Sequence, residues 1–343
     1  MNKRVIYYII LVIFTAITVY VVFTSQELDE IPELLNRTKR GYLLVAFCLM
    51  FLYLLINALI IQGIGSSISK EFNFRRSFFI SLAGQYYSLI TPFASGGQPA
   101  QVYLMKNKYN IPYKKGITVT LKKFIIFQMV VSLYAVAMFL FKYNLFMTKQ
   151  KEVLVFIYIG LIVNIIGGLF IIILAYNRKI IRNILNSIIY LLKKLRLFNN
   201  FDKNKFNKHI DEYADNIHEI KNNKKMMLKL IGLTIIQLTC YFSITYFIYL
   251  SLGFNQAHYI DILAIQTVLY VVISFIPTPG NAGASESGFY IMFSIYFSKE
   301  VLLYAMLLWR IIIYYSNLLI SGIVVLLDSL LHKTKIKFDE PID

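Results

Sequence analysis

The sequence predicts an all-α polytopic membrane protein with six full spans and two re-entrant helical hairpins arranged as an inverted repeat. Hydrophobic residues make up 58% of the chain and charged residues 15%, whereas a soluble globular protein carries about a quarter charged residues. The apolar residues also come in blocks long enough to cross a bilayer. We therefore expect a single transmembrane domain over residues 1–343, with repeat halves at about 41–141 and 226–329.

The repeat is visible at a constant offset of 187 positions (278 − 91 = 187). At this offset TPFASGGQPAQVYLM, which starts at residue 91, aligns with TPGNAGASESGFYIM, which starts at residue 278. The same register places Lys123 on Arg310, two cations inside otherwise apolar segments. Interrupted helices in corresponding halves of a transporter point to a binding site near the membrane midplane. The identical pairs are Thr91/Thr278, Pro92/Pro279, Gly96/Gly283, Tyr103/Tyr290 and Met105/Met292.

The first half of the chain predicts two spans and then a pair of short helices. Residues 5–23 form an apolar run that is too long for a signal peptide and lacks a small-residue cleavage site, so we expect a retained first span. Residues 41–64 form the second span. Residues 77–90 and 93–105 each reach only ~20 Å at about 1.5 Å per residue, short of a hydrocarbon core of about 30 Å. They are predicted to form a re-entrant hairpin.

The distribution of lysines supports the hairpin. A full crossing by residues 77–90 would place the lysine-rich loop at 106–115 outside, although Lys and Arg collect in cytoplasmic loops. With the hairpin, this loop lies inside. Residues 116–141 then cross outward and residues 153–176 return.

The second half repeats this plan after a basic segment. Residues 177–225 carry twelve Lys or Arg against five Asp or Glu and are predicted to be cytoplasmic. Part of this segment has the pattern of a helix lying on the inner leaflet or, alternatively, packed under the bundle. Spans are predicted at 226–252 and 301–327, with short helices at 260–276 and 284–297 between them. Both termini are then cytoplasmic in a multi-pass protein of the cell membrane, and the two hairpins enter from opposite sides.

The bends supply candidate binding residues. Gly96, Gly97 and Gly283 permit non-helical backbone whose N–H groups can cradle an anion, although Pro and Gly could also serve only to make the bend. Tyr103 and Tyr290 could cap a cavity. Polar side chains that could bind a ligand, or only satisfy the backbone of the bends, are Gln98, Gln101, Asn281 and Ser285.

Two cations and one acid lie deep in the apolar segments. Lys123 and Arg310 are predicted ~10–14 Å below the membrane surface. A cation at that depth costs several kcal/mol unless it is paired or hydrated, which favours a functional role. Snorkelling is the alternative for Lys123. Glu286 is the natural partner of Arg310, either as a structural pair that locks the repeats together or as a gate or headgroup ligand.

The net charge of +17 follows from the positive-inside bias and attraction to anionic lipids, so we expect no nucleic-acid partner. No Walker A motif, nucleophile elbow, metal cluster or zinc-protease helix is visible, and we expect no catalytic residue, no metal and no cofactor. The predicted partners are membrane lipids, anionic or zwitterionic phospholipids in particular, and a possible cytoplasmic protein at 177–225.

GGQPAQVYLM at 96–105 and PTPGNAGASESG at 277–288, followed by Arg310, resemble the membrane domain of the lysylphosphatidylglycerol synthase family, also called flippase-like integral membrane proteins. The resemblance runs from about residue 5 to residue 327. In that family the glycine-proline motif, the Gly-x-x-Glu motif (here 283–286) and the later arginine are characteristic. Lys122–Lys123 departs from the acid and arginine that relatives often have there, which puts a local ion pair in doubt.

The resemblance implies lipid translocation. Bifunctional members join this membrane half, which moves lysyl-phosphatidylglycerol between leaflets, to a soluble domain that transfers lysine from its tRNA. No such domain is visible after the last predicted span, so the resemblance gives no support to the synthase step and leaves enzymatic activity open. We expect transport of a phospholipid, aminoacylated phosphatidylglycerol among the candidates, or of another lipid-linked headgroup. The alternatives are a membrane subunit of a split lysyltransferase and a scaffold for a cytoplasmic partner.

Overall fold

The computed structural model describes residue 36 and residues 38–176 and 224–331. These residues form helices and helical turns without a strand, which confirms the predicted all-α class. The predicted first span at 5–23 and nearly all of the basic segment at 177–225 lie outside the described residues.

Five helical stretches in the described part of the chain are long and apolar enough to cross a membrane, and they correspond to the five predicted spans there. The last stretch contains a π-helical turn, η5 (Ile311–Tyr315), between α14 and α15. The total of six spans and two re-entrant hairpins stays a prediction. The helices are α3 (Arg40–Ser66), α6 (Tyr113–Phe141), α8 (Leu154–Tyr176), α11 (Lys224–Ser251), and α14 (Lys299–Arg310) continued by α15 (Ser316–Leu331).

The first pair of short helices is α4 (Phe74–Leu89) and α5 (Gly97–Tyr109), joined by the 3₁₀ turn η2 (Pro92–Ala94). The Asn73 side chain caps α4 by accepting a hydrogen bond from the Arg76 backbone N–H at 2.9 Å. The extended backbone of Thr91, the residue before proline, keeps α4 from continuing into the turn. With 16 and 13 residues, the helices are about 24 and 20 Å long, too short to span about 30 Å of hydrocarbon.

The second pair is α12 (Tyr259–Ile273) and α13 (Ala284–Phe293), joined by η4 (Pro279–Asn281). These helices have 15 and 10 residues and are shorter still. A Glu286 carboxylate oxygen accepts a hydrogen bond from the Gly283 backbone N–H at 2.7 Å, which caps the start of α13. Neither helix of this pair is long enough to cross a bilayer by itself.

The two hairpins have the same local backbone at the offset of 187. The turns η2 and η4 occupy equivalent positions, and α5 and α13 begin at equivalent residues. Phe93 (φ 55°) corresponds to Gly280 (φ 59°), and Ala94 (φ 53°) to Asn281 (φ 53°). This correspondence supports the interpretation of the sequence as a repeat.

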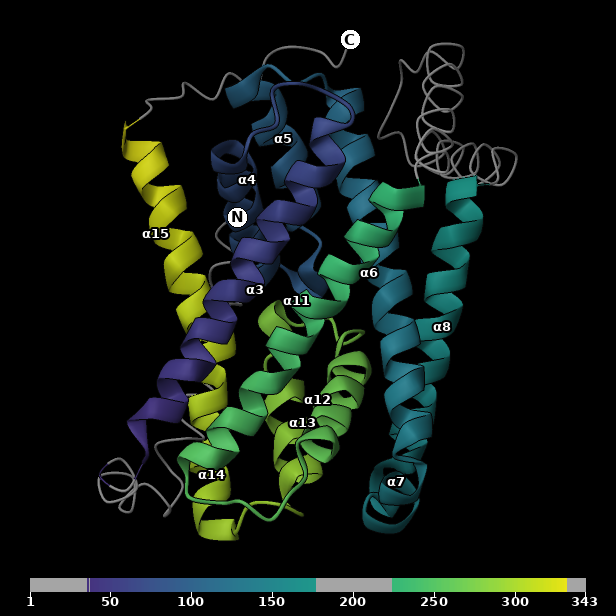
Figure 1. The fold of residues 1–343 in the computed structure, drawn as a ribbon, viewed down its shortest axis with the longest axis vertical. Coiled ribbons are helices and arrows are strands. Elements are labelled where there is room, and N and C mark those ends of the chain that lie inside the picture. The colour runs from purple at the N-terminus through teal and green to yellow at the C-terminus, as the bar shows by residue number, and fades with distance from the viewer. Residues whose placement is uncertain (1–35, 37, 177–223, 332–343) are drawn as a thin grey trace, which may run out of the picture.

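The hairpins point toward each other from opposite ends of the molecule (Figure 1): α4 and α5 lie in the upper half and α12 and α13 in the lower half. Their turns η2 and η4 are in contact, and η4 also contacts α4. The long helices α3, α6 and α11 pack against the short helices. The helical breaks of both hairpins therefore lie at the same level, near the middle of the molecule.

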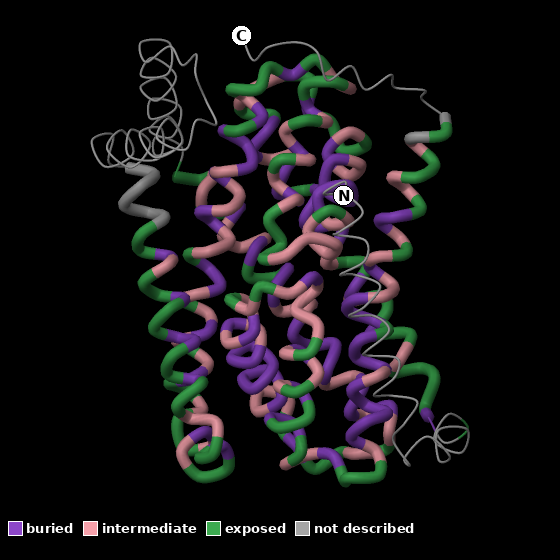
Figure 2. The backbone as a smooth tube through the Cα atoms, turned by 180° about the vertical axis from the view of Figure 1, so that it is seen from behind, coloured by how far each residue is buried: buried purple, intermediate pink, exposed green. Residues whose placement is uncertain are grey.

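The outer surface is apolar, as expected of helices that face lipid. Figure 2 shows exposed residues along the outer helices. On α8 these include Phe156, Ile159, Ile162 and Ile166. The long sides of the molecule are thus suited to contact with acyl chains.

The two ends differ in charge. The upper end in Figure 1 carries the loops around α4, α5 and the start of α11, which contain most of the described lysines and arginines. The lower end carries Glu152, Asp261 and Glu300 beside its cations, and Lys142 there pairs with Asp261 at 2.7 Å. By the positive-inside rule the upper end is predicted to face the cytoplasm.

Candidate functional site

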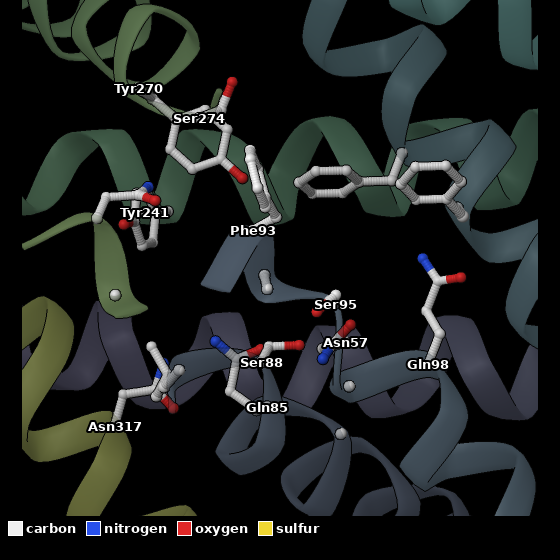
Figure 3. Close-up of a pocket in the computed structure, with 18 of the residues that line it drawn as sticks. Asn57, Gln85, Ser88, Phe93, Ser95, Gln98, Tyr241, Tyr270, Ser274 and Asn317 are labelled. Carbon is white, nitrogen blue, oxygen red and sulfur yellow. The ribbon is translucent and has the colours of Figure 1, made fainter. Parts of the chain in front are cut away.

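A cavity of about 760 Å³ lies where the tips of the two hairpins meet. Its walls come from α3, α4, α5, α6, α8, α11, α12, α13, η2, η4 and α14 to α15. Figure 3 shows side chains from these elements converging on it, with Phe93 from the first hairpin tip opposite Tyr241 and Tyr270. A cavity of this size falls in the range of small-molecule and headgroup sites.

The first hairpin brings Gly97, Gln98 and Gln101 to the cavity. Gly97 is required sterically, because a Cβ there would lie 2.0 Å from Ser88 Oγ and 2.6 Å from the Gly84 carbonyl oxygen. Two helices at this separation leave room only for hydrogen. The glycine therefore sets the close approach of α4 and α5 that shapes this wall.

Gly96 and Gln101 also serve the hairpin itself. The Gly96 N–H donates to Thr91 Oγ1 at 2.9 Å, and Gly96 does not line the cavity. Gln101 Nε2 donates to the Ile80 carbonyl oxygen at 3.3 Å. These two residues therefore stabilise the bend, which is the structural role that the sequence left open for them. The side chain of Gln98 makes no hydrogen bond within the part of the chain described.

The second hairpin contributes Asn281 and Ser285 to the cavity wall. Gly283 adopts a positive φ of 83° before α13 and does not line the cavity. Gly280, which belongs to the predicted glycine-rich bend but was not among the predicted site residues, lies against the ring of Tyr314, where a Cβ would come within 2.1 Å of a ring carbon. Its carbonyl oxygen accepts a hydrogen bond from Arg310 Nη1 at 3.2 Å.

Arg310 is buried, with 4% of its surface exposed, and its guanidinium contacts residues of the second hairpin and of η5. Arg310 Nε lies 2.7 Å from Glu286 Oε1, and the guanidinium carbon lies 4.5 Å from the centre of the Tyr314 ring. The ion pair joins α14 to the start of α13, as expected for these partners. Arg310 borders the cavity, whereas Glu286 does not.

Lys123 reaches the cavity from α6 and has no ion pair or hydrogen bond with another residue in the described part of the chain. It occupies the repeat position of Arg310 but lacks a counterpart of Glu286 there. The neighbouring Lys122 is buried and is not among the residues that line the cavity. Lys123 is therefore the cation at this site that is free to meet an anionic ligand.

Tyr103 and Tyr290 are not brought to the cavity. They are 37% and 39% exposed and lie on the outer faces of α5 and α13, away from the cavity wall. Tyr103 lies two residues after the cavity-lining Gln101, and residues two apart on a helix point in different directions. The two tyrosines match in the repeat because the faces of α5 and α13 match.

Sequence reasoning missed most of the polar wall, which comes from the long helices. Gln128 Nε2 donates to Ser132 Oγ at 3.3 Å, and Ser132 Oγ donates to Asn164 Oδ1 at 2.5 Å, which links α6 to α8 beside the cavity. The available signal was an amide inside an otherwise apolar span, which is rare without a role. Amides from these helices that line the cavity are Asn57, Gln128, Asn164, Gln237 and Asn317.

Residues 7–321 match the family model described as the lysylphosphatidylglycerol synthase TM region. Over 314 residues the chain is 24% identical to a UPF0104 membrane protein from Archaeoglobus fulgidus, an alignment that covers 88% of this chain and 91% of the relative.

Proposed function

Because this chain belongs to the family of the lysylphosphatidylglycerol synthase transmembrane region, we propose that it is a flippase-like transporter that moves a lipid headgroup between the two leaflets. The observation that carries the proposal is the cavity of about 760 Å³ between two opposed hairpin tips, which is lined by amides and aromatic rings and has Lys123 on its wall. Broken helices are tolerated at membrane depth where they line such a cavity. The lipid is a phospholipid, with aminoacylated phosphatidylglycerol among the candidates, or another lipid-linked headgroup.

The two hairpins give a route for alternating access. Each hairpin closes the cavity from one end of the molecule, and their tips meet at η2 and η4. A small outward movement of one hairpin would open the cavity to one leaflet while the other hairpin keeps it closed. The headgroup would cross inside the cavity while its acyl chains stay along the apolar outer helices.

Lys123 would hold the phosphate during the crossing. A cation without a counter-ion costs free energy near mid-membrane, and an anionic ligand offsets this cost. Arg310, already paired with Glu286, would keep the second hairpin attached to the α14–α15 helix while the cavity opens. Of the residues predicted from the sequence, all except Tyr103 and Tyr290 are thus proposed to line or support the binding site.

The test is lipid flipping in proteoliposomes with acyl-labelled fluorescent phospholipids and a membrane-impermeant quencher. Wild type should expose inner-leaflet label to the quencher, and Lys123→Gln should slow transport of anionic phospholipids roughly tenfold, the loss of one charge-assisted hydrogen bond. Lys151→Gln is the matched control, because Lys151 is exposed and far from the cavity. Equal rates in wild-type and protein-free vesicles for every lipid would refute the proposed function.

A further inference from the structure

The charges on the cavity wall select against a cationic headgroup. The residues that line it include Lys123 and Arg310 but no Asp or Glu of the described chain. Arg310 is neutralised by Glu286, so one uncompensated positive charge remains. A headgroup with a single negative charge balances it, whereas an ammonium group would find no carboxylate in a region of weak solvent screening.

The uncharged part of the wall is rich in amides. Nine Asn or Gln side chains line the cavity within the described residues, and they come from helices on every side. An amide offers both donors and an acceptor, as a hydroxyl group does. The amides of this wall can pair with a ligand that has several hydroxyl groups more fully than with a bare phosphate, which only accepts.

Besides Arg310 Nε, which is ion-paired with Glu286, three enclosed polar atoms of cavity-lining residues have no hydrogen-bond partner in the described part of the protein. They are Gln237 Oε1, Asn317 Oδ1 and Trp309 Nε1, on residues that are each 2% exposed or less. An unpaired buried polar atom costs stability, and native proteins rarely keep one without a reason. Two acceptors and one donor enclosed beside the same cavity are of the kinds that hydroxyl groups, which both donate and accept, can pair with.

We infer that the cavity takes a lipid headgroup in which one phosphate is joined to a neutral polyol such as glycerol or a hexose. The phosphate meets Lys123, and the hydroxyl groups meet Gln237, Asn317 and Trp309. This inference rests on the proposed function only in treating the cavity as the transport site. The same chemistry occurs in the headgroup of a glycerophospholipid and in a sugar phosphate on another lipid carrier.

The first arm of the test compares headgroups in proteoliposomes with wild-type protein. Acyl-labelled phosphatidylinositol and phosphatidylglycerol should cross about tenfold faster than phosphatidic acid, which lacks the polyol, as expected for one or two hydrogen bonds. Lysyl-phosphatidylglycerol, with its ammonium groups, should be among the slowest. A polyprenyl-phosphate hexose tests the other source, a sugar phosphate on another lipid carrier. Its crossing is measured by periodate oxidation of the sugar that becomes exposed. Lysyl-phosphatidylglycerol crossing as fast as phosphatidylinositol would overturn the inference.

The second arm uses two matched amides. Gln237 and Gln266 are equally buried, but Gln266 Oε1 accepts a hydrogen bond from Thr245 Oγ1 at 2.7 Å and does not line the cavity. Gln237→Met should lower the phosphatidylinositol to phosphatidic acid rate ratio about fivefold and leave the melting temperature unchanged or raised. Gln266→Met should lower the melting temperature and keep the ratio. An unchanged ratio in Gln237→Met would show that this amide meets no hydroxyl.

A binding measurement separates this inference from the proposed function. Short-chain phosphatidylinositol and phosphatidic acid are added to the detergent-solubilised protein, and the shift in melting temperature is recorded. If no lipid is flipped but phosphatidylinositol stabilises wild type more than phosphatidic acid does, and does so less in Gln237→Met, the transport proposal fails and the headgroup assignment stands. Equal shifts for both lipids in wild type would refute the assignment even if flipping occurs.

Discussion

Arg310 illustrates how a single buried cation connects distant parts of the chain. It contacts the Glu286 carboxylate, the Gly280 carbonyl oxygen and the Tyr314 ring. Tyr314 in turn donates a hydrogen bond to the Leu89 carbonyl oxygen of the first hairpin at 3.4 Å. The tips of both hairpins are thereby attached to the same turn of helix.

Removal of one partner of this ion pair should be costly. We expect Arg310→Met to lower the free energy of unfolding by about 3 kcal/mol, because the Glu286 charge is left buried without its partner. In a Glu286→Gln background the same substitution should cost at least ~1 kcal/mol less, since no orphaned charge remains. Denaturant titration of the purified protein, followed by circular dichroism, measures both values. Equal costs in the two backgrounds would show that the pair is not coupled.

The hairpin turns are the elements with unusual backbone. Gly280 and Asn281 suit the left-handed conformation, since glycine and asparagine visit it readily. The first hairpin places Phe93 and Ala94 in the same conformation, where a β-carbon is strained. The two turns therefore have the same shape, but the first has the higher conformational energy. Such strain tends to persist at functional sites.

The strain predicts opposite effects for one substitution at two nearby sites. Ala94→Gly should stabilise the protein by about 1 kcal/mol, because glycine removes the left-handed penalty. Ala100→Gly, inside helix α5, should destabilise it by about 1 kcal/mol, because glycine loses more conformational freedom there. Thermal unfolding of the two variants beside wild type measures the difference. A destabilised Ala94→Gly variant would contradict the strain.

The π-helical turn η5 interrupts the last long helix directly after Arg310. Turns of this type are rare and are frequent at functional sites. Its Tyr314 ring stacks on Arg310 and lies against Gly280. The break in helical register therefore lies where the second hairpin, the ion pair and the cavity meet.

At the scale of the whole molecule, the central feature is the opposition of the two hairpins. The two pairs of short helices approach each other from opposite ends of the molecule (Figure 1), and both contribute residues to the same cavity. The more basic end is predicted to be cytoplasmic. This arrangement is what an inverted repeat produces when both copies enter one membrane from opposite sides. It also explains why neither hairpin could form the cavity alone.

Cysteine accessibility in sealed vesicles tests this orientation. In a background without Cys48 and Cys240, Lys70→Cys and Asn107→Cys should react with an impermeant maleimide from the cytoplasmic face, because both ends of the first hairpin lie at the upper end of the molecule. Lys299→Cys, at the lower end, should react only from the opposite face; all three positions are exposed. Labelling of positions 70 and 107 from different faces would show that the first hairpin crosses the membrane once.

The class of protein, five of its spans and the positions of both helical breaks could be predicted from the sequence, because apolar block length, lysine distribution and Pro-Gly punctuation act locally along the chain. The ion pair of Arg310 with Glu286 was also accessible, since few charged residues lie at that depth. The face that each short helix turns toward the cavity could not be predicted. The sequence pattern alone does not distinguish the exposed Tyr103 from the cavity-lining Gln98, because the orientation of a short helix is set by its packing partners.

The amide wall was decided only by tertiary structure. Gln237, Asn317 and Trp309 lie on different helical turns, and these three residues line one cavity because α11 and the α14–α15 helix pack around the hairpin tips. Arg310 is paired because Glu286 lies at the start of α13. Lys123 has no such partner, because the first hairpin has no acid at the equivalent position. The symmetric positions of the two helical breaks were predictable from the sequence, because Pro and Gly act locally on the backbone. That both breaks face one cavity, with a single free cation among the residues described, follows from long-range packing, because only packing brings together groups that are far apart along the chain.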